Sequence, residues 1–485
     1  FVKFITMNKI FLFFLLLASL NLTGQPSSEK NKLIASINEN KNQYEESALK
    51  IWDWAEVGYQ EYKSAEELQR LLKNEGFSLE VGVANIPTAF VATYKNGEGP
   101  VIGILGEYDA LPGLSQTNEP KKNLRDGVSS GHACGHNLFG VASAASSIAI
   151  KKWMENTNTK GTIKFFGCPA EEGGSGKVYM VREGYFENVD IVLNWHPSNS
   201  NRASAGSSLA NKTGKFRFSG ISAHAAGAPQ RGRSALDGIE AMNNMLNMMR
   251  EHVDPESRIH YIITKGGDAP NVVPNFAEGY YYVRHPNPEE VRRLWERLEL
   301  CAKGAALGTE TTYTYEVTGG VYNILPNEVL QKLIHKNLTD VGGVVYNKEE
   351  RAYAEAISLT FGDNKKSLNI SEQIQPYVYY KETKGGGSTD VGDVSWAVPT
   401  GGFTTATYVP GTAGHSWQAA SCTGTSIGIK GMLNAAKVMA LTTYDLFMNK
   451  NLILKAQREF EEKRGKNFTY NPLIGDRAPA LNYRK

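Results

Sequence analysis

Short apolar runs alternate with helical patterns along the first two hundred residues of the chain. Four runs are rich in branched and aromatic residues and predict buried strands: 89–94, 101–106, 162–167 and 190–195. Apolar residues at helical spacing predict helices over 40–76, 137–149 and 175–182. Strands that alternate with helices favour a layered α/β domain with a mostly parallel central sheet.

The pattern changes after residue 209. Strand-like segments at 215–219, 258–264, 278–285 and 311–317 enclose helical segments at 234–249 and 289–306. The resulting β-α-β-β-α-β order is typical of a ferredoxin-like α+β fold. We therefore predict an inserted domain over 210–324, which divides the first domain into 28–209 and 325–448.

Three further segments complete the predicted organisation. Residues 343–385 are polar and irregular, which indicates an insertion or a mobile loop near the mouth of a site. Residues 449–485 predict a charged helix followed by a proline-containing coil that wraps the surface. The roles of both segments stay open at this stage.

The N-terminal segment has the order of a secretory signal. Lys9 precedes an apolar run over 10–18, and small and polar residues follow as far as Gln25. We expect a signal peptide over 1–24, with 1–6 an upstream extension because Met7 is the better start. An exported protein, periplasmic or secreted, is therefore expected. The alternative is a short N-terminal core helix in a cytoplasmic protein.

Composition excludes several classes of function. The 52 basic and 50 acidic side chains give a net charge of +2, which offers no support for nucleic-acid binding. Hydrophobic residues make up 41% of the chain, enough for a packed core, and no later stretch predicts a stable membrane span. The four cysteines are too widely spaced to predict a disulfide framework.

Five metal-type side chains stand beside glycine or proline near the ends of apolar runs. They are Cys134, His136, Glu172, His196 and His415. A lone histidine is usually a surface or hydrogen-bonded residue, and a lone cysteine is usually a small buried hydrophobe. However, α/β sheets bind their ligands beyond the carboxyl ends of strands. Five such coincidences favour a metal site with enough ligands for two divalent ions that share one.

The neighbouring acidic residues suggest a division of roles. Adjacent residues on an extended segment point to opposite sides, so Glu172 can bind a metal while Glu171 acts as general base toward water. Asp109 either orients a ligand histidine or caps a turn. Asp390 and Asp393 are likewise either orienting partners or turn residues. Mixed nitrogen, oxygen and sulfur donors permit zinc or manganese, which we expect, and also cobalt or nickel.

Several motifs together resemble a known family. The chain is similar to the dinuclear-metal amidohydrolases and peptidases that include aminoacylases and glutamate carboxypeptidase. The resemblance covers roughly residues 40–450 and rests on GEYDALPGL, GHACGHN, CPAEEGGSGK, GRSALD, PNVVPN, STDVGDVSW and GHSWQ. It implies that Glu171 is the general base and that Cys134 is shared between two metals. It also implies that the inserted domain is a lid that pairs with another lid in a dimer.

The resemblance implies roles for three residues of the inserted domain. His224 would stabilise the tetrahedral oxyanion in a neighbouring subunit's site. Asn271 and Arg284 would bind a substrate carboxylate, although Arg284 taken alone could equally form a surface salt bridge. Because all three lie outside the metal-binding domain, we expect that a lid closes or that a neighbouring subunit supplies them.

These features together predict an enzyme, a metal-dependent amidohydrolase that cleaves a linear amide. The resemblance points to an N-acyl or N-aroyl amino acid of the p-aminobenzoyl-glutamate kind. The alternatives are a dipeptidase or aminoacylase of the same family, or a noncatalytic metal-binding interaction protein that kept the fold. Retention of Glu171 argues against the noncatalytic alternative, because binding alone needs no base. The acyl group, the amino acid, the metal, and the choice between a homodimer and a heterodimer with a paralogous subunit stay open.

Overall fold

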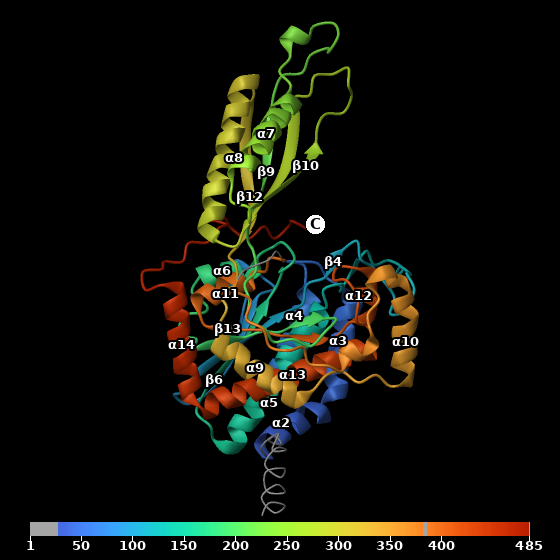
Figure 1. Ribbon diagram of the computed structural model, residues 1–485, viewed down its shortest axis with the longest axis vertical. Coiled ribbons are helices and arrows are strands. Elements are labelled where there is room, and N and C mark those ends of the chain that lie inside the picture. The colour runs from blue at the N-terminus through green and yellow to red at the C-terminus, as the bar shows by residue number, and fades with distance from the viewer. Residues whose placement is uncertain (1–27, 382–385, 485) are drawn as a thin grey trace, which may run out of the picture.

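The computed structural model describes residues 28–381 and 386–484, and the predicted signal segment lies outside these ranges. A rounded α/β body carries an elongated second domain that projects from one side (Figure 1). Among the residues described, no helix has both the length and the apolar character needed to cross a bilayer.

The body is built on a six-stranded sheet in the order β1-β2-β6-β3-β7-β13. Its strands are β1 (Ser78–Val81), β2 (Phe90–Asn96), β3 (Val101–Glu107), β6 (Gly161–Cys168), β7 (Ile191–Leu193) and β13 (Thr400–Gly401). The pairs β6/β3, β3/β7 and β7/β13 are parallel, and only the β1/β2 and β2/β6 pairs are antiparallel. The predicted mostly parallel α/β sheet is confirmed, and β13 returns to it from beyond the inserted domain.

Helix α5 (His136–Thr157) is buried along most of its length, because its alanine- and serine-rich sequence lets neighbours approach closely. It packs against β3 and against α13 (Ser426–Met448). A Cβ atom at Gly140 would lie 2.8 Å from the Glu107 carbonyl oxygen, so only glycine permits this approach. The close packing fixes the start of α5 beside the end of β3.

The single helix predicted over 40–76 is wrong. The structure has α2 (Ser28–Glu39), then α3 (Lys41–Trp54) and α4 (Tyr62–Asn74), with a loop between the last two. Ala55 and Tyr59 adopt left-handed backbone conformations, with φ of 45° and 63°, which end the helix. The loop pairs Val57 with Ala110, so tertiary contacts override the local helical pattern.

The inserted domain contains an antiparallel sheet in the order β10-β11-β9-β12. Its elements are β9 (Ala210–Ser219), α7 (Ala235–Met249), β10 (Arg258–Lys265), β11 (Phe276–His285), α8 (Pro288–Thr309) and β12 (Thr312–Val321). Both helices cover one face of this sheet, which confirms the predicted ferredoxin-like fold (Figure 1). We call this domain the lid; its base lies where Asn211 pairs with Arg284, and its tip lies beyond the pair of Ser219 with Phe276.

The irregular loop predicted over 343–385 is also wrong for much of its length. It contains α10 (Lys348–Ser358) and the short 3₁₀ helices η4 (Leu359–Asn364) and η5 (Leu368–Ser371). Asn347 and Glu350 form a reciprocal capping box at the start of α10. Buried apolar residues of this segment pack against α12 (Trp417–Cys422). Charged residues between these positions hide the helical period in the sequence.

The remaining elements complete the body and bring the chain back to the lid. They are α6 (Gly176–Arg182), α9 (Glu328–Val341), α11 (Val391–Ala397), α14 (Lys450–Arg464), and the short strands β4 (Leu111–Pro112), β5 (Ser130–Gly131), β8 (His196–Ser198) and β14 (Thr404–Ala406). We call residues 466–484 the C-terminal strap. It runs between the lid base and the body, with Leu473 in the lid core and Ile474 in the body core. It is therefore partly interior, where a surface coil was expected.

Candidate active site

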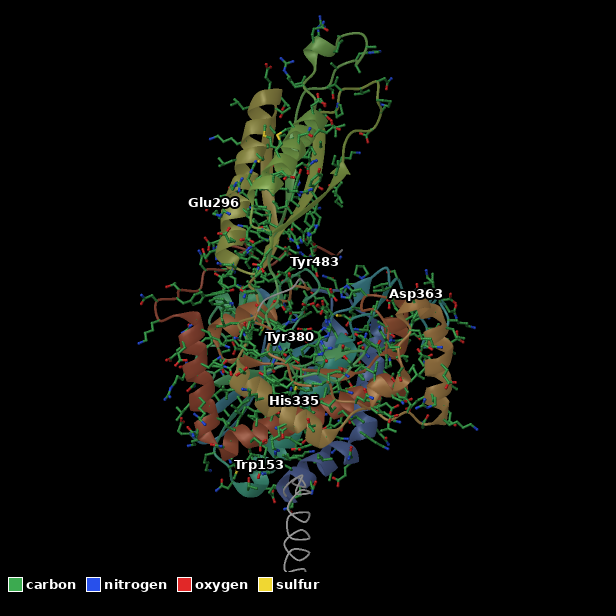
Figure 2. All side chains as sticks on the ribbon, in the orientation of Figure 1. Trp153, Glu296, His335, Asp363, Tyr380 and Tyr483 are labelled. Carbon is green, nitrogen blue, oxygen red and sulfur yellow. The ribbon has the colours of Figure 1, made fainter. Side chains whose placement is uncertain are left out.

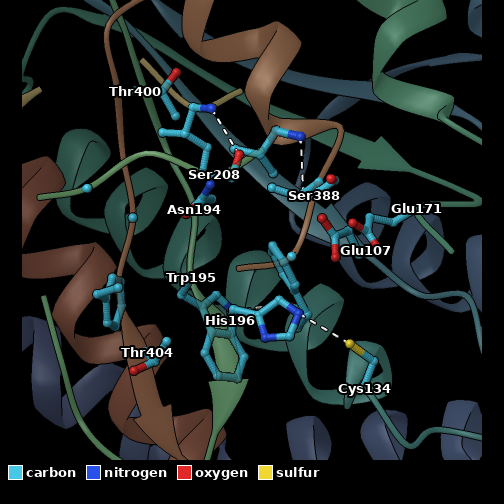
Figure 3. A pocket seen from close by; sticks show the side chains of 18 of the residues that line it. Glu107, Cys134, Glu171, Asn194, Trp195, His196, Ser208, Ser388, Thr400 and Thr404 are labelled. Atoms are coloured by element: carbon cyan, nitrogen blue, oxygen red, sulfur yellow. Dashed lines mark hydrogen bonds between the residues drawn. The ribbon is translucent and has the colours of Figure 1, made fainter. Parts of the chain in front are cut away.

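A tight turn between β5 and α5 places two of the predicted ligands. Gly135 has φ of 83°, and a Cβ atom there would lie 2.6 Å from Pro197, so the turn requires glycine. Cys134 thereby faces the start of β8, and its Sγ lies 3.4 Å from Nε2 of His196 (Figure 3). The turn joins ligands that are far apart in the sequence.

The structure brings all five predicted ligands together in two overlapping groups. Cys134, His136 and His196 form one, and Cys134, Glu172 and His415 form the other, with the donor atoms of each group within 4.8 Å of one another. Cys134 belongs to both groups. This arrangement suits two neighbouring cations with a common thiolate ligand.

Asp109 orients this cluster through two hydrogen bonds. Its Oδ1 lies 2.9 Å from Nδ1 of His136, and its Oδ2 accepts a hydrogen bond from the Glu172 amide at 2.9 Å. The choice left open for Asp109 therefore resolves toward orienting a histidine. Burial disfavours the Asp109 carboxylate, but the charge of His136 outweighs burial and lowers the pKa of Asp109.

The turn that carries the two adjacent glutamates is not the extended segment that the sequence suggested. Ala170 has φ of 56°, and its amide donates to Glu61 Oε1 at 2.8 Å, which holds a turn over residues 171–174. Glu171 still separates from Glu172, because it joins a third group with Glu107 and His136. Burial raises the pKa of Glu171 well above its usual value, and the charge of Glu107 adds to this effect.

A buried ion network that the sequence analysis missed lies behind the cluster. Lys177 Nζ lies 2.6 Å from Glu107 and 2.7 Å from Asp390, and all three side chains are almost fully buried. Asp390 thus acts as an ion-pair partner, while Asp393 accepts hydrogen bonds from Tyr322 and Tyr470 instead. The available signal was a set of charged residues inside motifs that had already been singled out.

Replacing Lys177 with methionine is expected to destabilise the metal-free protein by about 3–5 kcal/mol, because two buried carboxylates lose their common cation. Urea unfolding would measure this loss. Lys336→Met is the matched control, since the Lys336 side chain is 63% exposed and pairs only with Asp340 one helical turn away. A Lys177→Met change no larger than that of the control would contradict a structural role for the network.

Two cavities meet at the cluster. One, of about 550 Å³, is lined by apolar side chains that include Phe139, Trp195 and Phe403 (Figure 3). The other, of about 410 Å³, lies at the lid base and is lined by polar residues. Glu171, Glu172 and His415 line both cavities. A molecule that occupied both would pass its central bond over the cluster.

The three lid residues singled out by the resemblance do not lie together. Arg284 pairs with Asn211 at the lid base and lines the polar cavity of its own chain, so for Arg284 the expected need for lid closure or a neighbour is wrong. His224 and Asn271 are exposed neighbours at the tip. The ten residues of β11 separate the tip from the base, a distance of roughly 30 Å.

Comparisons with known proteins agree with these features. A sequence model described as the peptidase dimerisation domain matches residues 210–310. One of the subunits of p-aminobenzoyl-glutamate hydrolase from Escherichia coli strain K12 is 40% identical over 453 residues, which cover 88% of this chain and 94% of the relative. The Xaa-Arg dipeptidase of Mus musculus is 30% identical over 426 residues, 85% of this chain and 88% of the relative.

Solved structures share the fold. The YXEP protein of Bacillus subtilis, described as a dinuclear metal-binding peptidase of the M20 family, aligns with a TM-score of 0.57 at 16% identity. The alignment covers 85% of this chain and 99% of that one. At this identity the likeness concerns the fold, and the chemistry must be argued from the residues described above.

Proposed function

The chain belongs to the M20 family of amidohydrolases and peptidases, and from this premise we propose that it cleaves the amide bond of an N-aroyl amino acid of the p-aminobenzoyl-glutamate kind. The observation that carries the proposal is the junction of the two cavities. An apolar cavity suits an aromatic acyl group, and a polar cavity suits an amino acid. Glu171, Glu172 and His415 line the junction, where the scissile amide would lie.

Two divalent cations fit the cluster, held by Cys134, His136, Glu172, His196 and His415. His136 Nε2 and Glu172 Oε1 are buried and lack a hydrogen-bond partner among the described residues, as expected of atoms that await an ion. When bound, the ions would polarise the carbonyl and lower the pKa of a water molecule. The donor set suits zinc or manganese, with cobalt or nickel as alternatives.

The protein's own groups supply the proton transfers and the orientation. Glu171 would remove a proton from the attacking water and deliver it to the leaving nitrogen. Its proximity to His136 and Glu107 supports this role, because it lies beside the cluster without belonging to the two ligand groups that share Cys134. Asp109 would keep the proton of His136 on Nδ1, so that Nε2 faces the metal.

Lid pairing would complete the site. His224 and Asn271 lie at the tip, too far from their own cluster, so a second copy would contribute them. The exposed edge strand β10 supports pairing, because Ile262 and Ile263 are 60% and 42% exposed on it. We therefore propose a homodimer through the lid, with a paralogous partner as the alternative.

Product analysis of purified protein would test the proposed function. The panel would contain p-aminobenzoyl-glutamate, benzoyl-glycine, N-acetyl amino acids and dipeptides, with metals restored one at a time after chelation. Release of the free amino acid from the aroyl substrate at the highest rate would support the proposal. Faster cleavage of dipeptides would favour a dipeptidase, and no cleavage of any substrate would favour the noncatalytic alternative.

The shared position of Cys134 leads to a prediction about metal content. Wild-type protein is expected to hold about two ions per chain, and Cys134→Ala to lose affinity for both, because the thiol belongs to both ligand groups. His415→Ala should weaken mainly one ion. Elemental analysis after dialysis would measure the difference. Equal losses in the two variants would contradict the shared-ligand arrangement.

A further inference from the structure

The C-terminal strap reaches the candidate site through a series of specific contacts. Tyr470 donates to Asp393 at 2.6 Å, Arg182 donates to the Arg477 carbonyl at 2.8 Å, and Gln60 donates to the Leu481 carbonyl at 2.9 Å. Figure 2 shows Tyr483 at the junction of lid and body. The strap is therefore held along its length up to the edge of the polar cavity.

The last described residues of the strap rest on the turn that carries the catalytic glutamates. Arg484 donates from Nη2 to the Glu172 carbonyl at 2.8 Å, and Tyr483 donates to the same oxygen at 3.1 Å. The Tyr483 ring also packs edge-on against Tyr59, with centroids 5.5 Å apart. These contacts fix the Arg484 guanidinium on the wall of the cavity.

Two guanidinium groups line this cavity with unused donors. Nε of Arg284 and Nε of Arg484 are both buried and have no hydrogen-bond partner among the described residues. Asn211 Oδ1 and Ser388 Oγ, also on the cavity wall, are buried and unpaired as well among those residues. Buried polar groups normally have partners, so this concentration indicates a strongly polar ligand.

An amino acid with two carboxylates matches this chemistry. Guanidinium groups bind carboxylates through charge-assisted hydrogen bonds, and a single α-carboxylate would use only one of the two arginines. We propose that Arg484 binds the side-chain carboxylate of a dicarboxylic amino acid, the leaving half of the substrate, while Arg284 binds its α-carboxylate. This assignment rests on the proposed function and makes Arg484 a specificity-determining residue.

The test compares p-aminobenzoyl-glutamate with p-aminobenzoyl-glutamine, which differ only in the side-chain charge. Wild-type protein should prefer the glutamate substrate. Arg484→Ala should lower kcat/KM for that substrate by about 10- to 100-fold and for the glutamine substrate by less than about threefold, so the preference collapses. Arg484→Lys, which keeps the charge but loses the planar fork, should fall between the two.

Arg477→Ala serves as the matched control on the same strap. Arg477 lies 3.6 Å from Glu316 of the lid and is absent from the residues that line the polar cavity. Its replacement should leave the preference for glutamate in place. Equal losses for both substrates in Arg484→Ala would show that the strap acts only through structure, and would overturn the proposal.

A binding measurement separates this inference from the proposed function. Calorimetric titration of the two compounds into Glu171→Gln protein and into Glu171→Gln/Arg484→Ala protein reports recognition without hydrolysis. A preference for the glutamate compound that disappears with Arg484 would support the inference even if wild-type protein cleaves neither compound. Equal binding of both compounds to the protein that retains Arg484 would overturn it, whatever the outcome for catalysis.

Discussion

Replacing Glu171 with glutamine is expected to lower turnover by at least about a hundredfold, as for the loss of a general base. The amide is close in size to the carboxylate but cannot accept the proton of the attacking water. Metal content should stay near that of wild type, because Glu171 lies outside the two ligand groups that share Cys134. Steady-state kinetics and elemental analysis on the same preparation would measure both quantities.

The adjacent Glu172→Gln variant provides the matched control. It makes the same chemical change one residue away, at a side chain grouped with Cys134 and His415. Its metal content should fall, and part of its lost turnover should return at high metal concentration. Wild-type turnover in Glu171→Gln would mean that another group is the base.

Replacing His224 with alanine is expected to lower turnover by about 10²- to 10³-fold, as for the loss of an oxyanion donor. Nδ1 of His224 accepts hydrogen bonds from the amides of Ala226 and Gly227, at 3.2 and 3.0 Å. The neutral ring therefore carries its proton on Nε2, which can donate to a developing negative charge. The Michaelis constant should change much less than turnover.

Subunit mixing tests whether His224 acts on a neighbouring chain. A dimer of one His224→Ala chain and one Glu171→Gln chain has one complete site if the lid tip crosses to its partner. Random exchange makes half of the dimers mixed, so activity should recover to about a quarter of wild type. A mixture that exchanges chains and stays inactive would contradict the contribution in trans. Each variant mixed with itself provides the baseline.

Local patterns in the sequence were sufficient for the lid and the central sheet. Branched runs such as 162–167 and the helical period over 234–249 are read within single elements, so the sequence alone predicts them. The candidate ligands were also visible, because Cys134 and His196 each stand at a strand end or helix start. These features depend on short-range patterns that the fold preserves.

Features that depend on distant parts of the chain could not be predicted in the same way. The helix break after Trp54 is set by a loop whose Val57 pairs with Ala110. Lys177 belongs to the site only because Asp390 folds against it from more than two hundred residues away. Arg484 gave no local signal at all, since a lone arginine in a coil is usually exposed to solvent. The expected export signal stays a prediction.

The placement of the strap has a consequence for biosynthesis. During translation, the strap emerges after every other described element, whereas the last of the five candidate ligands, His415, emerges with the body. Because domains tend to fold as the nascent chain appears, the cation-binding pocket can form before recognition of the substrate is possible. A newly made chain would therefore acquire its ions first and its selectivity for a charged side chain last.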